Sequence, residues 1–273
     1  MFIEKKYSPL ISIISVVLNN RQGLAKTISS IKEQIFQDYE LLIIDGASID
    51  GTAEEAFKEA QPPKIRVISE PDKGIFDAMN KGLDQASGRF VVFLNTGDTF
   101  VDKNTLACIE PFLLRDDIDL LYGGCIKSIA GKNVNIPANN HTSIIYGMFG
   151  VHQTMYFRLS VIGPMRYDSR LRVCGDYDFT ARFLKKSKKI VNISKSLCIF
   201  ERPNTSFRLW MTGLDENWEI QRDVLSVPLM QRIFFRIVSL VMRYTYFYCP
   251  GIYRFFLSRN FKNFFWFFWS RIW

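Results

Sequence analysis

Short apolar runs alternate with stretches of helical periodicity through roughly the first hundred residues of the chain. The run Phe90–Leu94 is five residues long and has no polar member, which is typical of a strand covered on both faces. Strands that alternate with helices of about ten residues form βαβ units, and such units build mostly parallel sheets. The alternation therefore predicts an α/β chain with a wound sheet, because the crossovers between parallel strands share one hand. The predicted strands cover residues 10–18, 40–44, 64–69 and 90–94, and the predicted helices cover residues 23–34, 52–60 and 75–86.

Polar segments that contain amides, hydroxyls, carboxylates and glycines follow the four predicted strands. They cover residues 19–21, 45–52, 70–74 and 95–98. The carboxyl ends of strands in an open α/β sheet are where ligands bind, and glycines let the backbone approach a ligand closely. Each segment alone could be an ordinary turn or a helix cap. Because the four segments lie at one edge of the predicted sheet, a binding site is favoured there. Their amides, hydroxyls and carboxylates match the polar groups of a nucleotide.

The chain lacks the sequence motifs of two other classes of nucleotide-binding protein. The first polar segment has no G-x-G-x-x-G pattern, which a dehydrogenase needs to place a pyrophosphate over a helix N-terminus, and no G-x-x-x-x-G-K-S/T loop is present. The five cysteines are scattered, with no C-x-x-C pair, so we expect reduced thiols and a cytosolic setting. The N-terminal residues do not have the pattern of a secretory signal.

The last 46 or so residues differ from the rest of the chain in composition. No acidic residue follows Asp223, and seven Arg and Lys residues in this tail supply nearly all of the net charge of +8. The tail also carries about 17 of the 40 aromatic residues. Because nearly all of the excess positive charge lies in this aromatic segment, no nucleic-acid partner is expected.

The spacing of the tail arginines predicts an amphipathic helix. Arg232, Arg236 and Arg243 fall on one helical face, and apolar side chains fill the others. Basic residues among Phe and Trp fit a helix that lies in the plane of an anionic membrane surface. No stretch of 18 uncharged apolar residues occurs, so a membrane-spanning helix is not expected. The alternative is that the aromatics pack on the catalytic domain or in a homo-oligomer interface.

Several segments together resemble glycosyltransferase family 2, a group of inverting enzymes with the Rossmann-like GT-A fold. They are residues 13–19, 43–52, 70–82, 95–98 and 174–178. The amino-acid sequence of residues 70–82, E-P-D-K-G-I-F-D-A-M-N-K-G, resembles that of bacterial transferases for exopolysaccharide, colanic acid and O-antigen. The resemblance implies a GT-A catalytic domain over residues 1–205, with a nucleotide-binding half (1–100) and an acceptor half (101–205). Residues 206–273 would then form a helical, membrane-associating or oligomerising tail.

The resemblance also assigns the donor nucleotide to a set of polar residues. They are Asn19, Asp45, Asp72, Lys73, Asn95 and Asp98. Asp45 would accept a hydrogen bond from the imide N–H of uracil. Lys73 and Arg21 are the candidates for diphosphate contacts. Asp98 matches the last acid of the family's D-x-D metal motif, although Asn95 and Gly97 stand where acids are expected. Mn²⁺ or Mg²⁺ is expected on this single carboxylate, because such ions are often held by one or two carboxylates plus substrate phosphates.

The second half of the resemblance assigns the acceptor side and the base. Inverting transfer needs a base that takes the proton from the attacking hydroxyl, and Asp176 matches the acid with that role. Asp178 is the fallback base, and it could equally cap a helix or bind acceptor hydroxyls. His152 and Gln153 match the region that positions sugar and acceptor, with a metal ligand as a further role for His152.

Together these features predict an inverting glycosyltransferase. It would move a hexose or N-acetylhexosamine from a nucleotide-diphosphate sugar, with UDP as the nucleotide, to a lipid-linked glycan. The product would belong to surface polysaccharide biosynthesis, and the protein would be cytoplasmic and peripheral on the inner face of the cell membrane. Arg202 and residues 204–206 lie where related enzymes place a mobile loop over the diphosphate. The reduced metal motif leaves a second hypothesis open, a catalytically impaired nucleotide-sugar-binding or membrane scaffold protein.

Overall fold

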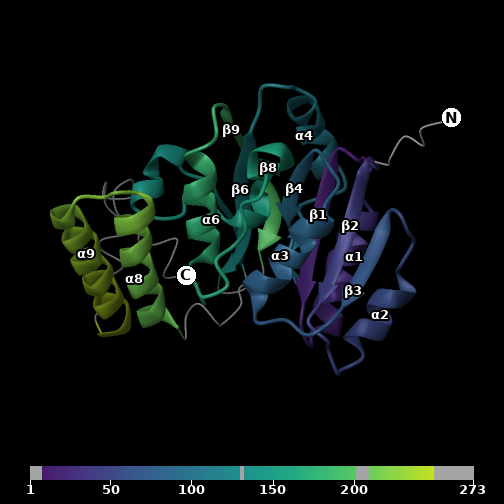
Figure 1. Ribbon diagram of the computed structural model, residues 1–273, viewed down its shortest axis with the longest axis horizontal. Coiled ribbons are helices and arrows are strands. Elements are labelled where there is room, and N and C mark those ends of the chain that lie inside the picture. The colour runs from purple at the N-terminus through teal and green to yellow at the C-terminus, as the bar shows by residue number, and fades with distance from the viewer. Residues whose placement is uncertain (1–7, 130–131, 201–208, 249–273) are drawn as a thin grey trace. The chain divides into compact units, whose positions relative to one another are not determined.

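The computed structural model describes residues 8–129, 132–200 and 209–248, and it forms two compact units (Figure 1). The first unit comprises residues 1–139, 150–170 and 183–202, and the second comprises residues 140–149, 171–182 and 203–273. Two segments of the predicted catalytic domain therefore group with the C-terminal helices. The predicted loop at Arg202 and residues 204–206, and the tail beyond Tyr248, lie outside the described residues.

Among the residues that the structure describes, the first unit has one sheet of nine strands in the order β3-β2-β1-β4-β8-β6-β9-β5, with β7 paired to β6. The strands are β1 (Ile11–Val17), β2 (Tyr39–Asp45), β3 (Ile65–Ser69), β4 (Phe90–Phe93), β5 (Thr99–Phe100), β6 (Leu120–Ile129), β7 (Lys132–Ile136), β8 (Met155–Arg158) and β9 (Ile190–Phe200). Strands β3, β2, β1 and β4 are parallel and lie side by side (Figure 1). Strand β8 runs antiparallel to β4 and β6, so the sheet becomes mixed beyond β4. The α/β class and the wound, parallel half are confirmed.

The first unit also contains helices, and the longer ones each bury a stripe of apolar side chains. The helices are α1 (Arg21–Lys32), α2 (Thr52–Lys58), α3 (Ile75–Gln85), α4 (Thr105–Leu113), the 3-10 helix η2 (His152–Thr154) and α5 (Leu159–Ile162). Strands β1 and β2 are buried along their whole length, as the apolar runs predict. Helix α3 packs on β1 at Gly82, where any side chain would collide with Ile14. The seven elements predicted between residues 10 and 94 all form, and their ends differ by only a few residues.

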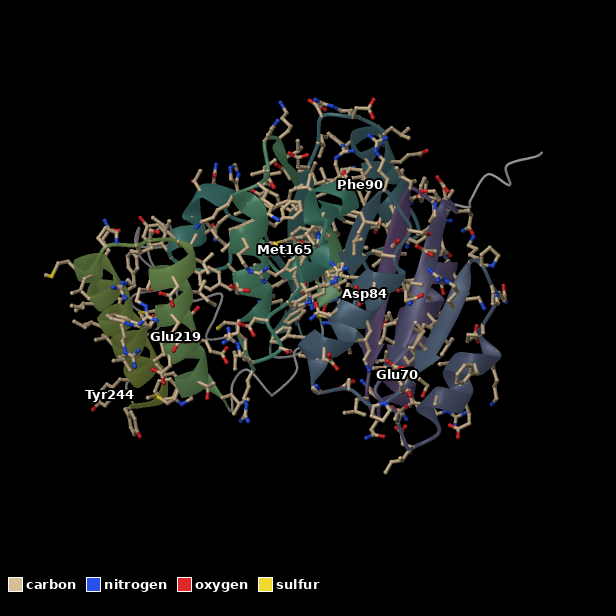
Figure 2. The ribbon with its side chains drawn as sticks, viewed as in Figure 1. Glu70, Asp84, Phe90, Met165, Glu219 and Tyr244 are labelled. Carbon is tan, nitrogen blue, oxygen red and sulfur yellow. The ribbon has the colours of Figure 1, made fainter. Side chains whose placement is uncertain are left out.

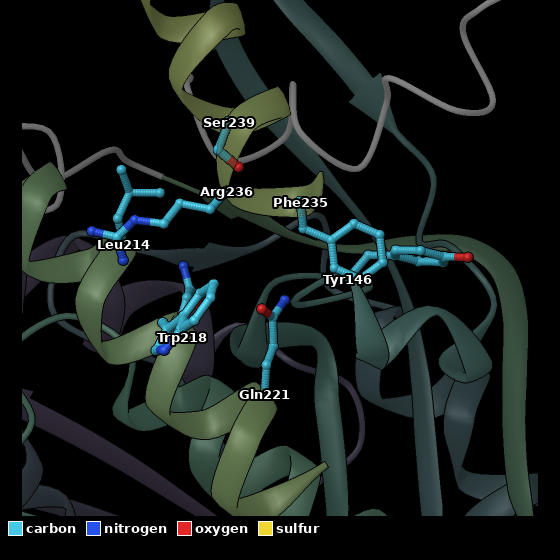
Figure 3. A pocket seen from close by; sticks show the side chains of 8 residues that line it. Tyr146, Leu214, Trp218, Gln221, Phe235, Arg236 and Ser239 are labelled. Atoms are coloured by element: carbon cyan, nitrogen blue, oxygen red, sulfur yellow. The ribbon is translucent and has the colours of Figure 1, made fainter. Parts of the chain in front are cut away.

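The second unit is helical in its described part. It contains the 3-10 helix η1 (His141–Ile145), most of α6 (Gly175–Leu184), α8 (Trp210–Glu219), a π-helical turn η3 (Ile220–Val224) and α9 (Leu229–Tyr248). The ring centroids of Tyr146 and Phe235 are 4.8 Å apart, and Gln221 Nε2 donates to the carbonyl of Ile145 at 3.2 Å. These three side chains line a small pocket with Trp218 (Figure 3). The described part of the predicted appendage, residues 209–248, is helical, and none of the described helices is long and apolar enough to cross a membrane.

Candidate functional site

The segments that follow β1 and β2 are joined to each other through Asn19. Its backbone N–H donates to Ser48 Oγ at 2.8 Å, and its side-chain Oδ1 accepts the N–H of Ile49 at 2.9 Å. Asn19 has a φ of 49°, a left-handed conformation that asparagine tolerates better than most residues. The structure therefore places Asn19 beside the segment that contains Asp45.

Asp45 ends β2 and is fully buried. Its Oδ2 accepts hydrogen bonds from the N–H of Ser48 at 3.1 Å and from Ser69 Oγ at 2.6 Å. Its Oδ1 has no hydrogen-bond partner within the described part of the chain. A buried carboxylate oxygen without a donor is costly, so a ligand that brings an N–H would relieve it. The Asp72 carboxylate lies close by, because a side chain at Gly46 would collide with Asp72 Oδ2.

The two candidate diphosphate contacts have different surroundings. Lys73 is exposed, and its backbone N–H donates to Asp77 Oδ2 at 3.0 Å at the start of α3. Glu70, labelled in Figure 2, begins the same segment. Arg21 forms an ion pair with Glu55 at 2.8 Å on the surface. Exposed pairs contribute little stability, so Arg21 can exchange this partner at small cost.

Thr27 on α1 shapes the segment that follows β4. Its Oγ1 accepts the N–H of Gly97 at 3.0 Å and donates to the carbonyl of Asp98 at 2.8 Å. Gly97 has a φ of 97°, which strongly favours glycine. Thr96 Oγ1 donates to the carbonyl of Val16 at 2.8 Å, which holds the segment against β1. Thr27 was not predicted as a site residue. The only sequence signal for it is that a polar side chain stands in an otherwise apolar helical stripe.

Asp98 lies in a buried polar cluster with residues that come from η2. Its side chain is 3% exposed, and Gln153 Nε2 donates to its Oδ2 at 2.7 Å. Asn95 Nδ2 and His152 Nε2 are 3.1 Å apart. The oxygens Asn95 Oδ1 and Gln153 Oε1 are buried, and neither has a hydrogen-bond partner among the residues that the structure describes. The structure thus brings together four residues that the sequence selected from two separate segments.

The donor set around Asp98 fits a hard divalent cation that binds together with phosphate. The described residues contain no group of three or more His, Cys, Asp or Glu side chains that could hold a metal ion. Asp98 supplies one carboxylate, Asn95 and Gln153 supply buried amide oxygens, and His152 supplies a ring nitrogen. Mg²⁺ and its analogues keep several waters and use one or two carboxylates plus substrate phosphates. Such a set suits a metal held jointly with a diphosphate.

The other two predicted acids lie in the second unit, in the first turn of α6. Asp178 is buried, and its Oδ2 accepts from Arg182 Nε at 2.9 Å and Nη2 at 2.5 Å. Asp176 is partly exposed, and its Oδ1 accepts the N–H of Tyr177 at 2.8 Å. Asp178 is therefore held in an ion pair within its own helix, and Asp176 is the acid that solvent or a substrate can reach.

Glu216 on α8 holds the backbone that leads into α6. Its carboxylate is buried and accepts three backbone N–H groups, from Arg172 at 2.7 Å, Val173 at 3.0 Å and Cys174 at 2.7 Å. These donors directly precede the helix that carries Asp176. A charged acceptor makes the stronger class of hydrogen bond, so this contact fixes the entry into α6.

A Glu216→Ala variant is expected to lower the free energy of unfolding by about 3 kcal/mol, because three backbone N–H groups, one buried and two partly buried, lose their charged acceptor. Urea denaturation measures the change. Asp215→Ala is the matched control on the same helix, since it removes only an exposed pair with Arg236 and should cost less than about 1 kcal/mol. Equal losses in the two variants would contradict the assigned role of Glu216.

Comparison with known proteins identifies the family. The model of the family described as glycosyl transferase family 2 matches residues 12–189, well over half of the chain. The "PGL/p-HBAD biosynthesis glycosyltransferase" of Mycobacterium tuberculosis (strain ATCC 25177 / H37Ra) is 31% identical over 182 residues, which cover 64% of this chain and 70% of that protein. The "UDP-Glc:alpha-D-GlcNAc-diphosphoundecaprenol beta-1,3-glucosyltransferase WfgD" of Escherichia coli is 33% identical over 246 residues, which cover 85% of this chain and 93% of that protein.

Solved structures share the fold at lower identity. S. aureus TarS 1-349 in complex with UDP-GlcNAc matches with a TM-score of 0.67 and 17% identity, over 93% of this chain and 77% of that chain. The mannosyltransferase PcManGT from Pyrobaculum calidifontis, in complex with GDP-Man and Mn2+, matches with a TM-score of 0.61 and 16% identity, over 80% and 66%. The chain therefore belongs to glycosyl transferase family 2, as its motifs predict, and it is a glycosyltransferase with the GT-A fold.

Proposed function

We propose that the chain is an inverting glycosyltransferase that moves a hexose or N-acetylhexosamine from a UDP-sugar to a lipid-linked glycan in surface polysaccharide biosynthesis. The observation that carries the proposal is the buried Asp45 Oδ1, which lacks a partner within the described residues at the carboxyl edge of the parallel strands. A uracil imide N–H is a donor that this oxygen can accept. Complexes of TarS contain UDP and UDP-GlcNAc, and the E. coli relative is named for UDP-Glc.

The other donor contacts follow from the same edge. Asp72, whose carboxylate lies against Gly46, would bind the base or the ribose, and Asn19 would border the base. Lys73 is exposed, so its ammonium can reach the diphosphate. Asn95 and Asp98 complete the donor side. Mn²⁺ or Mg²⁺ held by Asp98, with His152 as a second ligand, would neutralise the charge that develops on the leaving diphosphate.

Asp176 is the proposed base. Its carboxylate takes the proton of the acceptor hydroxyl while that oxygen attacks the anomeric carbon and the nucleoside diphosphate leaves from the opposite face. The single displacement inverts the anomeric configuration. Asp178, held by Arg182, would orient the acceptor, and His152 with Gln153 would position the sugar.

The acceptor is proposed to be a lipid-linked diphosphate saccharide. The name of the E. coli relative specifies a diphosphoundecaprenol acceptor, and this relative covers most of the chain. Such an acceptor is anchored in a bilayer, so the protein is proposed to work as a peripheral protein on the inner face of the cell membrane, with its C-terminal tail on the lipid.

UDP is expected to raise the melting temperature in the presence of Mn²⁺, whereas CDP is not. The N3 atom of cytosine is an acceptor and would face the carboxylate of Asp45, while the N3–H of uracil donates to it. A ligand that binds only the folded state raises its apparent stability, so thermal shifts with UDP, CDP, GDP and dTDP and their sugars measure the preference.

An Asp45→Ala variant is expected to bind UDP about 10- to 100-fold more weakly, since a hydrogen bond to a charged group contributes about 1.5–3 kcal/mol. Ser69→Ala serves as the control, because it removes a donor to Oδ2 and leaves Oδ1 in place. Titration calorimetry with UDP compares the two variants. A GDP- or dTDP-sugar that shifts melting where no UDP-sugar does would overturn the donor assignment.

A further inference from the structure

Helix α9 presents a continuous apolar stripe to solvent. Six of its side chains, each between 37% and 76% exposed, define this stripe: Met230, Ile233, Phe234, Ile237, Val241 and Tyr244. Apart from the adjacent Ile233 and Phe234, successive members are three or four residues apart, which places the stripe on one face of the helix, and no charged residue interrupts that face. Tyr244 marks its C-terminal end in Figure 2, where its ring centroid lies 4.9 Å from that of Tyr248. A contiguous exposed apolar surface of this kind marks an interaction site.

The arginines of α9 lie on a different face, which packs on α8. The guanidinium carbons of Arg232 and Arg236 lie 4.6 and 5.7 Å from the ring centroid of Trp218, and Arg236 also pairs with Asp215 at 2.7 Å. Figure 3 shows the side chains of Arg236 and Trp218. Arg243 is buried and stacks on Trp210 at 4.5 Å. Cation–π contacts of this kind stabilise the pairing of the two helices. The arginines of this helix, which the sequence pattern related to an anionic membrane surface, thus contact α8.

We infer that the apolar stripe of α9 docks this protein on a lipid bilayer, with the helix lying in the membrane plane and the stripe inserted below the headgroups. An in-plane helix buries its apolar face in this way and keeps its polar face in the headgroup layer. Arg232 and Arg236 lie on the face that packs on α8, but both remain partly exposed, so their long side chains can still extend their charge toward anionic headgroups. The inference rests on the proposed work at a membrane and names the face that makes the contact.

Charge favours a bilayer over a second copy of the chain as the occupant. Helix α9 has no acidic residue, and none follows Asp223 in the sequence, so a second copy of this helix offers no opposite charge to the exposed parts of Arg232 and Arg236, whereas anionic headgroups do. The 25 residues after Tyr248 contain eleven aromatic and four basic residues and again no acid. Basic and aromatic residues in this combination match the interfacial layer of an anionic membrane.

Flotation of the full-length protein with vesicles tests the inference. The wild type is expected to bind vesicles of phosphatidylcholine with phosphatidylglycerol, and Ile237→Glu and Phe234→Glu are each expected to lower the partition coefficient about ten-fold or more, because each places a charge in the inserted face. Gln231→Glu is the matched control, since it adds the same charge at an exposed position of α9 outside the stripe.

The possible results distinguish a lipid bilayer from a second copy of the chain as the partner of the apolar stripe. Loss of binding in both stripe variants, with binding retained by Gln231→Glu and an unchanged melting temperature, supports the inference. Unchanged vesicle binding in the stripe variants overturns it. A wild type that sediments as a dimer, and becomes a monomer in the stripe variants without a loss of vesicle binding, also overturns it in favour of a second copy. The assay contains no donor or acceptor, so its failure is distinct from a failure of glycosyl transfer.

Discussion

An Asp176→Asn variant is expected to lose about 10²- to 10⁴-fold in turnover, the range that a general base contributes. Asparagine keeps the size and the hydrogen bond to the N–H of Tyr177 but cannot take a proton from the acceptor hydroxyl. Donor affinity should not change, because the proposed UDP contacts come from the first unit. Release of UDP, measured with a lipid-linked acceptor and with water as the acceptor, gives the turnover, and calorimetry gives the donor affinity.

Asp178→Asn is the control for this prediction. Asp178 is buried against Arg182, so its replacement should lower stability, and turnover should fall far less than in Asp176→Asn. Unchanged turnover in Asp176→Asn would remove the base assignment. A wild type that binds UDP-sugars but turns over none of them would favour the catalytically impaired binding or scaffold protein.

The first half of the fold could be predicted because its signals are local in the sequence. Buried parallel strands such as β1 and β2 read as continuous apolar runs, and the stripe on α1 repeats at helical spacing. Parallel pairing then places the ends of β1, β2 and β3 at one edge, so the meeting of their polar segments follows from the strand order. The segments that contain Asn19 and Asp45 could therefore be predicted to share one site, whereas the roles of the two residues follow from the family resemblance.

Contacts between distant segments could not be predicted in the same way. Gln153 and Asp98 are 55 residues apart, and Glu216 reaches backbone donors more than 40 residues before it. Nothing in the local pattern distinguishes Glu216 from an ordinary helical surface acid. The sequence pattern of α9 predicts an arginine face and an apolar face, but it does not predict which of the two packs against the rest of the protein. Stacking of Arg232 and Arg243 on tryptophans decides it, because the guanidinium retains favourable contacts when it packs on an aromatic ring.

Removal of divalent metal is expected to lower turnover of the wild type by about 10²- to 10⁴-fold, since a metal contributes several kcal/mol of charge stabilisation at a leaving diphosphate. Asp98→Asn should reproduce the loss, because it removes the only carboxylate of residues 95–98 while keeping an oxygen that can accept from Gln153. Turnover after chelation and after readdition of Mn²⁺ measures the first effect. Calorimetric titration of Mn²⁺ in the presence of UDP measures the second without any turnover.

The Asn95→Asp substitution is expected to change the affinity for Mn²⁺ in the opposite direction to Asp98→Asn. Asn95 Oδ1 is buried, without a hydrogen-bond partner among the described residues, so a carboxylate there would add a second anionic ligand next to Asp98. Mn²⁺ should then bind more tightly in the absence of nucleotide than it does in the wild type, because hard cations favour sites with more carboxylates. Full turnover of the wild type after chelation would show that Asp98 does not act through a metal. Weaker Mn²⁺ binding in Asn95→Asp would instead show that the amide at position 95, through its contact with His152, is part of what shapes the site.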